Sequence, residues 1–142
     1  MTPKTLKRTL VIKERIRQVR RAELFEAQTA VDAAEKSLQL EAARHTSTAA
    51  LLTRAGEFSA HELALASEQV QATQRALKQA EVELNARKHE HEERQEVVGE
   101  ATREVRAIEA LHTRKLAELK READKREQSE LDEASARKGK PR

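Results

Sequence analysis

The chain has no cysteine, tryptophan or tyrosine, and only two phenylalanines, three glycines and two prolines among its 142 residues. Without cysteine it can form neither a disulfide framework nor a thiol nucleophile, whatever the redox state of its compartment. With two aromatic residues and 37% charged residues it cannot build the large core of an ordinary globular domain. These absences argue against most enzyme folds.

Long apolar runs are also missing. No stretch of about 18 apolar residues is present, and the basic start lacks the apolar segment and cleavage site of a secretory signal. Glu14 and Glu23 argue against an organellar transit peptide. We therefore expect a soluble protein without membrane insertion.

The residues that dominate instead are strong helix formers, arranged in a seven-residue repeat. Alanines such as Ala27, Ala34, Ala66, Ala80 and Ala101 alternate with larger residues in each repeat, which lets two helices approach closely. Regular apolar spacing of this kind argues against disorder. The repeat positions are Leu24, Val31, Leu38, His45 and Leu52 in the first half, and Leu63, Val70, Leu77, Leu84, His91, Val98, Val105, His112 and Leu119 in the second.

The two repeats are separated by a turn at residues 56–59. Gly56 suits the residue that ends the first helix, and Ser59 with Glu62 has the spacing of a capping box that starts the second. Phe58 and Leu63 occupy the two positions of a hydrophobic staple. A kink in one continuous helix is the less favoured alternative.

These features predict an all-α fold, a long antiparallel two-helix coiled-coil hairpin with an overhanging C-terminal helix. The hairpin occupies residues 1–136, with one helix over about 3–55 and another over about 60–136, and residues 137–142 form a disordered basic tail. Thr2 and Pro3 supply the first cap, and Leu6, Leu10, Ile12, Ile16 and Val19 form one broad apolar face. Matching the repeats about the turn pairs Val31 with Leu84 and Leu10 with Val105, within one helical turn. The overhang is either covered by a partner or a frayed, solvated helix.

Charge is distributed unevenly along this hairpin. Residues 1–21 carry eight basic residues and the single acid Glu14, whereas residues 22–62 are net acidic. A basic end suits an acidic or phosphate-bearing partner. Nucleic acid is disfavoured because stacking aromatics and groove-binding motifs are missing, and a membrane-surface role for residues 4–21 remains an alternative. His89 to Glu92 point in different directions on a helix and make a poor metal site, and no cofactor motif is present.

Two runs at the ends of the chain are distinctive: the opening Leu6-Lys7-Arg8-Thr9-Leu10-Val11-Ile12-Lys13-Glu14-Arg15 and the closing acidic run from Arg121 to Glu133. They resemble the start and the acidic end of the export stalk family of type III secretion, known as YscO in injectisomes and FliJ in flagella. Flagellar members carry tyrosines before the turn, where this chain has His45, Thr48 and Ala49. The resemblance therefore favours the injectisome branch.

The resemblance implies two contact surfaces. The paired termini of the family enter a hexameric export ATPase, which assigns to ATPase binding the basic residues Arg8, Lys13, Arg15, Arg17, Arg20, Arg21, Arg114, Lys115, Lys120 and Arg121. The tip of the hairpin meets the cytoplasmic ring of the export gate, which assigns to gate binding Leu51, Leu52, Arg54, Glu57, Phe58, His61, Glu62 and Leu65.

The expected function is that of a non-enzymatic central stalk in a bacterial protein export apparatus. The protein is expected in the cytoplasm, peripheral to the export machinery and monomeric when free, with export chaperones as further partners of the family. It is expected to bind no small-molecule substrate, cofactor, metal or nucleic acid. A generic coiled-coil adaptor or scaffold is the main alternative, and a nucleic-acid-binding helical protein is the weaker one.

Overall fold

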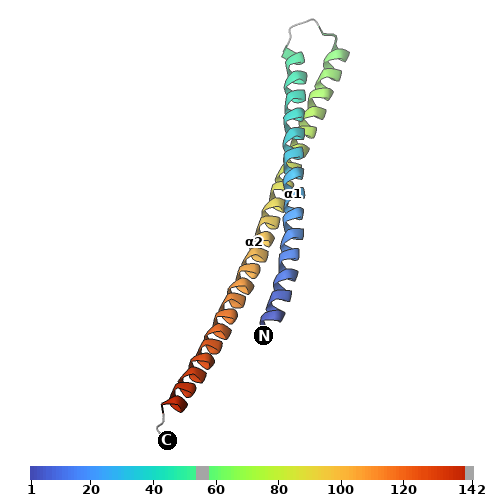
Figure 1. Ribbon diagram of the computed structural model, residues 1–142. Helices are drawn as coiled ribbons and strands as arrows, with labels where there is room; N and C mark the ends of the chain where they lie inside the picture. Colours follow the sequence, from blue (N-terminus) through green and yellow to red (C-terminus); the bar gives the residue numbers. More distant parts are fainter. Residues whose placement is uncertain (54–57, 140–142) are drawn as a thin grey trace. The chain divides into compact units, whose positions relative to one another are not determined.

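The structure is a computed structural model that describes residues 1–53 and 58–139, which contain two α-helices. Helix α1 spans Pro3–Thr53 and helix α2 spans Ala60–Lys138 (Figure 1). The two helices pack against each other as a helical hairpin, which confirms the predicted all-α fold. Within the described ranges, neither helix contains an apolar stretch sufficient to cross a membrane.

Both helices start where predicted, and α2 ends two residues later than predicted, whereas residues 54 and 55, at the predicted end of the first helix, lie outside the described residues. Helix α2 continues through Lys138, so Arg137 and Lys138 are helical and their assignment to a disordered tail was wrong. Residues 100–138 contain neither glycine nor proline to interrupt the helix, and the basic pair interacts favourably with the negative end of the helix dipole. Gly56, the predicted end of the first helix, and residues 140–142 lie outside the described residues.

Each helix begins with a side-chain cap. The hydroxyl of Thr2 accepts a hydrogen bond of 3.2 Å from the Thr5 amide, with Pro3 at the first helical position. At the start of α2, the Glu62 amide donates to the Ser59 hydroxyl at 3.2 Å, and the Ser59 amide donates to the Glu62 carboxylate at 3.4 Å. This reciprocal pair confirms the predicted capping box.

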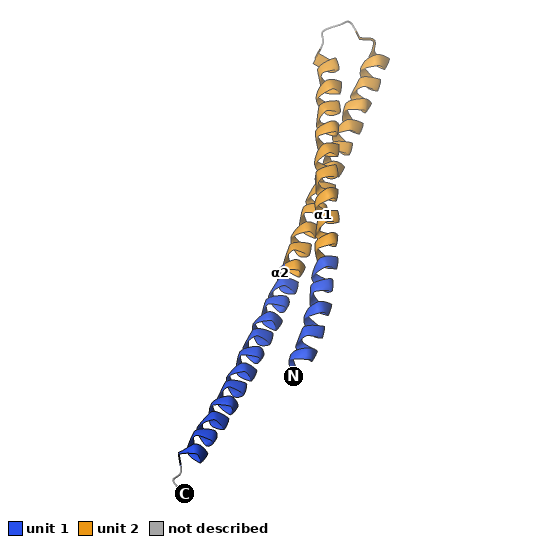
Figure 2. Ribbon diagram, in the orientation of Figure 1, with its two compact units in different colours: residues 1–19, 99–142 blue, residues 20–98 orange. Residues whose placement is uncertain are grey.

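The chain divides into two compact units, shown in Figure 2. Unit 1 combines residues 1–19 with residues 99–142, and unit 2 contains residues 20–98. Each unit is therefore an antiparallel pair of helical segments that are distant in sequence.

The core of unit 1 is narrow. Val105 is fully buried, at 0% exposure, and Leu6 and Ala101 are also buried. The Lys13 ammonium forms an ion pair with the Glu104 carboxylate at 3.0 Å, which links α1 to α2. The register predicted from the turn places position 102 opposite Lys13, two residues from the observed partner and within the expected tolerance of one helical turn.

The broad apolar face predicted at the start of α1 is divided between core and solvent. Leu6 is buried and Leu10 half-buried, but Ile12 and Val19 are 57% and 56% exposed, and Ile16 is also exposed. A single packed helix covers only one side of its neighbour, and Ile12, Ile16 and Val19 lie on the sides of α1 that α2 leaves in solvent.

Beyond the packed part of unit 1, α2 continues without cover. Every residue from Leu116 to Gly139 is exposed. We call the helical part of this segment, residues 116–138, the C-terminal extension. It includes Leu116 and Leu119, which lie on the same face of α2 as Ile108 and His112 because the four positions are spaced by four, four and three residues. The predicted overhang is thus present as a helix.

Unit 2 has its own core. Val31, Ala34 and Leu84 form a buried cluster, with Leu38 packed against it, which confirms the predicted contact between Val31 and Leu84. The helices are also linked by the Glu23–Arg94 ion pair at 3.2 Å and by a hydrogen bond of 3.1 Å between His45 Nδ1 and the Thr73 hydroxyl. Positions rise along α1 as they fall along α2, so the pairing is antiparallel.

Gly99 lies inside α2, where glycine is less favourable than other residues unless a close approach or a bend requires it. A Cβ built at Gly99 would meet no heavy atom within 4 Å, so nothing packed against this position requires glycine. Close approach is therefore not the reason for this residue.

Candidate interaction surfaces

The predicted ATPase-binding residues fall into two groups, those that are exposed and those that are half-buried within the hairpin. In unit 1, the exposed members project into solvent and the half-buried ones lie beside the other helix. The exposed members are Arg8, Arg15, Arg114, Lys120 and Arg121, and the half-buried members are Lys13, Arg17 and Lys115.

The half-buried cations contribute to the structure of the hairpin. Lys13 is paired with Glu104 across the two helices. The Nε atom of Arg17 is buried and has no hydrogen-bond partner among the described residues. A buried N–H without a hydrogen-bond partner costs stability, and the burial of this atom keeps part of the guanidinium group away from solvent. These two residues are less available to a partner than Arg8 or Arg15.

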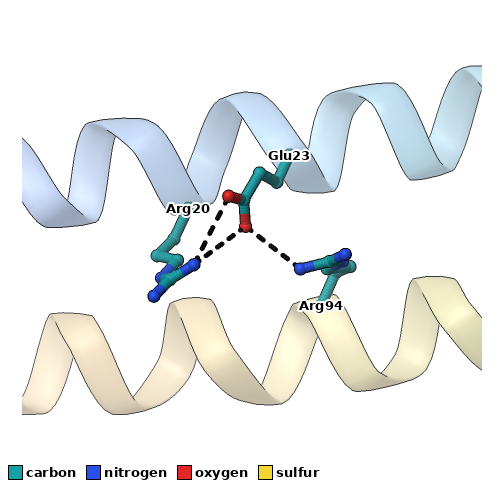
Figure 3. A network of polar contacts seen from close by, with 3 residues as sticks. All are labelled: Arg20, Glu23 and Arg94. Atoms are coloured by element: carbon teal, nitrogen blue, oxygen red, sulfur yellow. Dashed lines mark hydrogen bonds and ion pairs between the residues drawn. The ribbon is translucent and has the colours of Figure 1, made fainter.

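The cations of unit 2 show the same contrast. Arg20 and Glu23 project from α1 and Arg94 from α2, and the single carboxylate lies between the two guanidinium groups (Figure 3). Arg20 Nη1 and Arg94 Nη1 each lie 3.2 Å from Glu23 Oε2. Arg21 is exposed. Of this neighbouring pair, only Arg21 presents its charge without an ion pair in the described structure.

A second ionic group lies along α2. Arg87 contacts Glu83 at 2.9 Å and Glu90 at 3.4 Å. The hydrogen bond and charge of Glu83, followed by the charge of Glu90, raise the pKa of Arg87 above its ordinary value. The group is solvent-exposed, so the effect on stability is small.

An apolar hollow of about 310 Å³ lies in unit 1 where α1 begins beside α2. Met1, Leu6 and Leu111 provide its apolar lining, and Arg114, Lys115 and Glu118 surround it with charge. Predicted ATPase-binding residues of α2 therefore border an apolar recess next to the C-terminal extension. Such a surface can accept an apolar side chain flanked by carboxylates.

The predicted gate-binding tip is described in part, because Arg54 and Glu57 lie outside the described residues. Leu51, Phe58, His61, Glu62 and Leu65 are exposed, and Leu52 is half-buried. Leu63, predicted to continue the buried repeat, is also exposed, so the packed seam of unit 2 does not reach the first turn of α2. The staple between Phe58 and Leu63 stays a prediction.

The histidines of the repeat occupy half-buried positions, as expected of polar residues placed in a seam. His45 hydrogen-bonds Thr73, and His91 and His112 are half-buried. His89 lies 3.1 Å from Glu93 one helical turn away. No cluster of three or more metal-ligating side chains occurs in residues 1–53 and 58–139.

Sequence reasoning missed several exposed apolar residues outside the repeat. Phe25, Leu40 and Val82 are more than half exposed. The available signal was their position: none of them falls in the seven-residue series, so the seam could not bury them.

Comparison of the chain with protein-family models, with curated protein sequences and with solved structures gives no match.

Proposed function

We propose that the protein is the non-enzymatic central stalk of a type III protein export apparatus in the bacterial cytoplasm. In this role its basic open end binds a hexameric export ATPase and its tip binds the cytoplasmic ring of the export gate. Export chaperones are further partners. The resemblance of both ends of the chain to the stalk family suggests this role.

The observation that supports the proposal most directly is the C-terminal extension. Leu116 and Leu119 are exposed on the same helix as Arg114, Lys120 and Arg121. Exposed apolar side chains beside unpaired cations are suited to a partner surface with apolar recesses and carboxylates. A ring of ATPase subunits that encloses the extension would bury these leucines.

A stalk can act without a catalytic site of its own. Contact with one part of a six-subunit ring favours one state of the contacted subunits, and this bias can couple their ATP turnover. A tip bound to the gate at the same time would connect that state to export. Gate binding at the tip would depend on exposed residues such as Phe58 and Leu65.

The test is stimulation of ATP hydrolysis by the cognate export ATPase. We expect the intact protein to increase the rate, and the triple variant Arg114→Glu, Lys120→Glu, Arg121→Glu to lose the effect. These residues are exposed, so the reversals should leave the hairpin folded. The matched control reverses Arg75, Lys78 and Lys88, which are exposed cations of unit 2 outside the predicted surface.

Absence of stimulation by the intact protein would reject the proposal. Equal loss in the test and control variants would show a general charge effect and would also reject the predicted surface. Circular dichroism of each variant confirms that helix content is retained.

A coiled-coil scaffold remains the second candidate, because exposed Leu111, Leu116 and Leu119 could also pair two copies of the chain. Sedimentation velocity at several concentrations distinguishes the two functions. A stalk is expected to stay monomeric, whereas a scaffold associates as the concentration rises and dissociates when these leucines are replaced by serine.

A further inference from the structure

The outer side of α1 in unit 1 carries an apolar surface that the hairpin leaves uncovered. Val11, Ile12, Ile16 and Val19 are all exposed, at 38% to 57% of their surface. Ile12, Ile16 and Val19 are spaced by four and three residues and therefore lie on one face of the helix. We call these four residues the outer α1 face.

Positive charge borders this face. Lys4, Lys7, Arg8 and Arg15 are exposed, and helical spacing places Arg8 and Arg15 next to Ile12. The only acid in residues 1–21 is Glu14, which is half-buried. A partner with many negative charges is therefore not repelled anywhere along this side of the helix.

The opposite side of the same helix is held by α2. Leu6 is buried against the unit 1 core, and Lys13 is paired with Glu104. The segment is therefore helical before any partner arrives. Binding through the outer α1 face would require neither folding of the segment nor separation of α1 from α2, which lowers its entropic cost.

From this arrangement we propose that the outer α1 face binds the surface of a membrane rich in anionic phospholipid, with α1 lying in the plane of the headgroups. Branched aliphatic side chains enter the boundary between headgroups and acyl chains, and the bordering lysines and arginines bind lipid phosphates. The four apolar residues are not part of the proposed ATPase contact, whereas Arg8 and Arg15 belong to both surfaces.

Nucleic acid fits the same charge less well. Binding to single strands relies on aromatic stacking, and binding to duplex phosphates gains nothing from four exposed aliphatic residues. The apolar residues and the cations occur together, which is the arrangement that an interfacial helix requires.

The experiment is flotation of the full chain with vesicles of phosphatidylcholine alone and of phosphatidylcholine mixed with phosphatidylglycerol. We expect binding to the mixed vesicles only, and weaker binding as salt is raised. Replacing Ile12, Ile16 and Val19 together by Gln should abolish it. Reversing Lys4 and Arg8 to Glu should lower the apparent partition coefficient by more than about tenfold.

Matched controls use side chains of similar exposure elsewhere. The apolar control replaces Phe25, Leu40 and Val82 by Gln, and the charge control reverses Lys78 and Lys88 to Glu. Both controls should bind the mixed vesicles like the unaltered chain. Circular dichroism verifies that every variant remains helical.

Three results would overturn the proposal. The first is no binding to the mixed vesicles, or equal binding to both kinds. The second is binding that survives the apolar triple substitution, with stronger binding to duplex DNA, which would assign the cations to nucleic acid. The third is concentration-dependent sedimentation that the triple substitution removes, which would assign the face to a second copy of the chain.

Discussion

Ser59 and Glu62 start α2 with two hydrogen bonds between neighbours in sequence. Such contacts depend on local spacing alone, which is why the sequence was sufficient to predict them. The contacts of Lys13 with Glu104 and of Glu23 with Arg94 depend on the register between two helices and were not predicted. Charged residues are so frequent in this chain that spacing alone does not select a partner for any of them.

Replacing Ser59 by Ala should lower the free energy of unfolding by about 1 kcal/mol, because the Glu62 amide loses its acceptor. Urea unfolding followed by circular dichroism measures the change. The control is Ser67→Ala, an exposed serine inside α2, which should be neutral or slightly stabilising since alanine is the better helix former. A neutral result for Ser59→Ala would show that the cap does not stabilise the hairpin.

Val105→Ala should cost about 2 kcal/mol of stability, because Val105 is the fully buried side chain of the unit 1 core. The same change at Val82, which is 68% exposed, should lie within about 0.5 kcal/mol of the unaltered chain. Equal costs at the two positions would contradict the described core. Thermal and urea unfolding of the two variants provide the comparison.

Among the elements, the seven-residue repeat predicted the seam well in its middle and poorly at its ends. Val31, Leu84 and Val105 are buried as expected, whereas Leu63 and Leu119 are exposed although they belong to the same series. A repeat specifies which side of a helix can be buried, but burial also requires the other helix to extend that far. The apolar residues at the start of α1 divide between core and solvent for a different reason, because α2 covers only one side of α1 there.

Gly99→Ala should raise the stability of the hairpin by about 1 kcal/mol, because glycine inside a helix costs conformational entropy and a methyl group meets no neighbour there. The reciprocal control is Ala86→Gly, at an exposed position of α2, which should lower stability by a similar amount. Differential scanning calorimetry measures both. A destabilised Gly99→Ala variant would show that the backbone at this position needs glycine for a reason other than space.

For the whole molecule, composition and spacing were enough to predict a helical hairpin with a C-terminal extension, because few other folds can be built from these residues. They could not predict which cations remain available. Arg8 and Lys13 are basic residues of the same stretch, but Lys13 is paired with Glu104 of the other helix, and the sequence of the stretch does not show this pairing. The candidate surfaces therefore offer fewer available cations to a partner than the sequence indicated.

Ending the chain at Lys115 should change the free energy of unfolding by less than about 1 kcal/mol, because every residue from Leu116 to Gly139 is exposed. Removing residues 1–12 should cost much more, because it deletes buried Leu6 and uncovers Val105. Urea unfolding of the two shortened chains checks this order. The opposite order would mean that the extension contributes to the core.

Helix α2 has one continuous hydrogen-bonded backbone but two kinds of tertiary surroundings, and amide hydrogen exchange should separate them. Amides near Ala101 and Val105 become accessible to solvent only when the unit 1 core opens. Amides of residues 116–138 need only local fraying, because no neighbouring helix holds them, and an unsupported helix of this length is marginally stable in water. The amide exchange rate should therefore change from slow to fast within a few residues of Lys115, although α2 is one uninterrupted helix there.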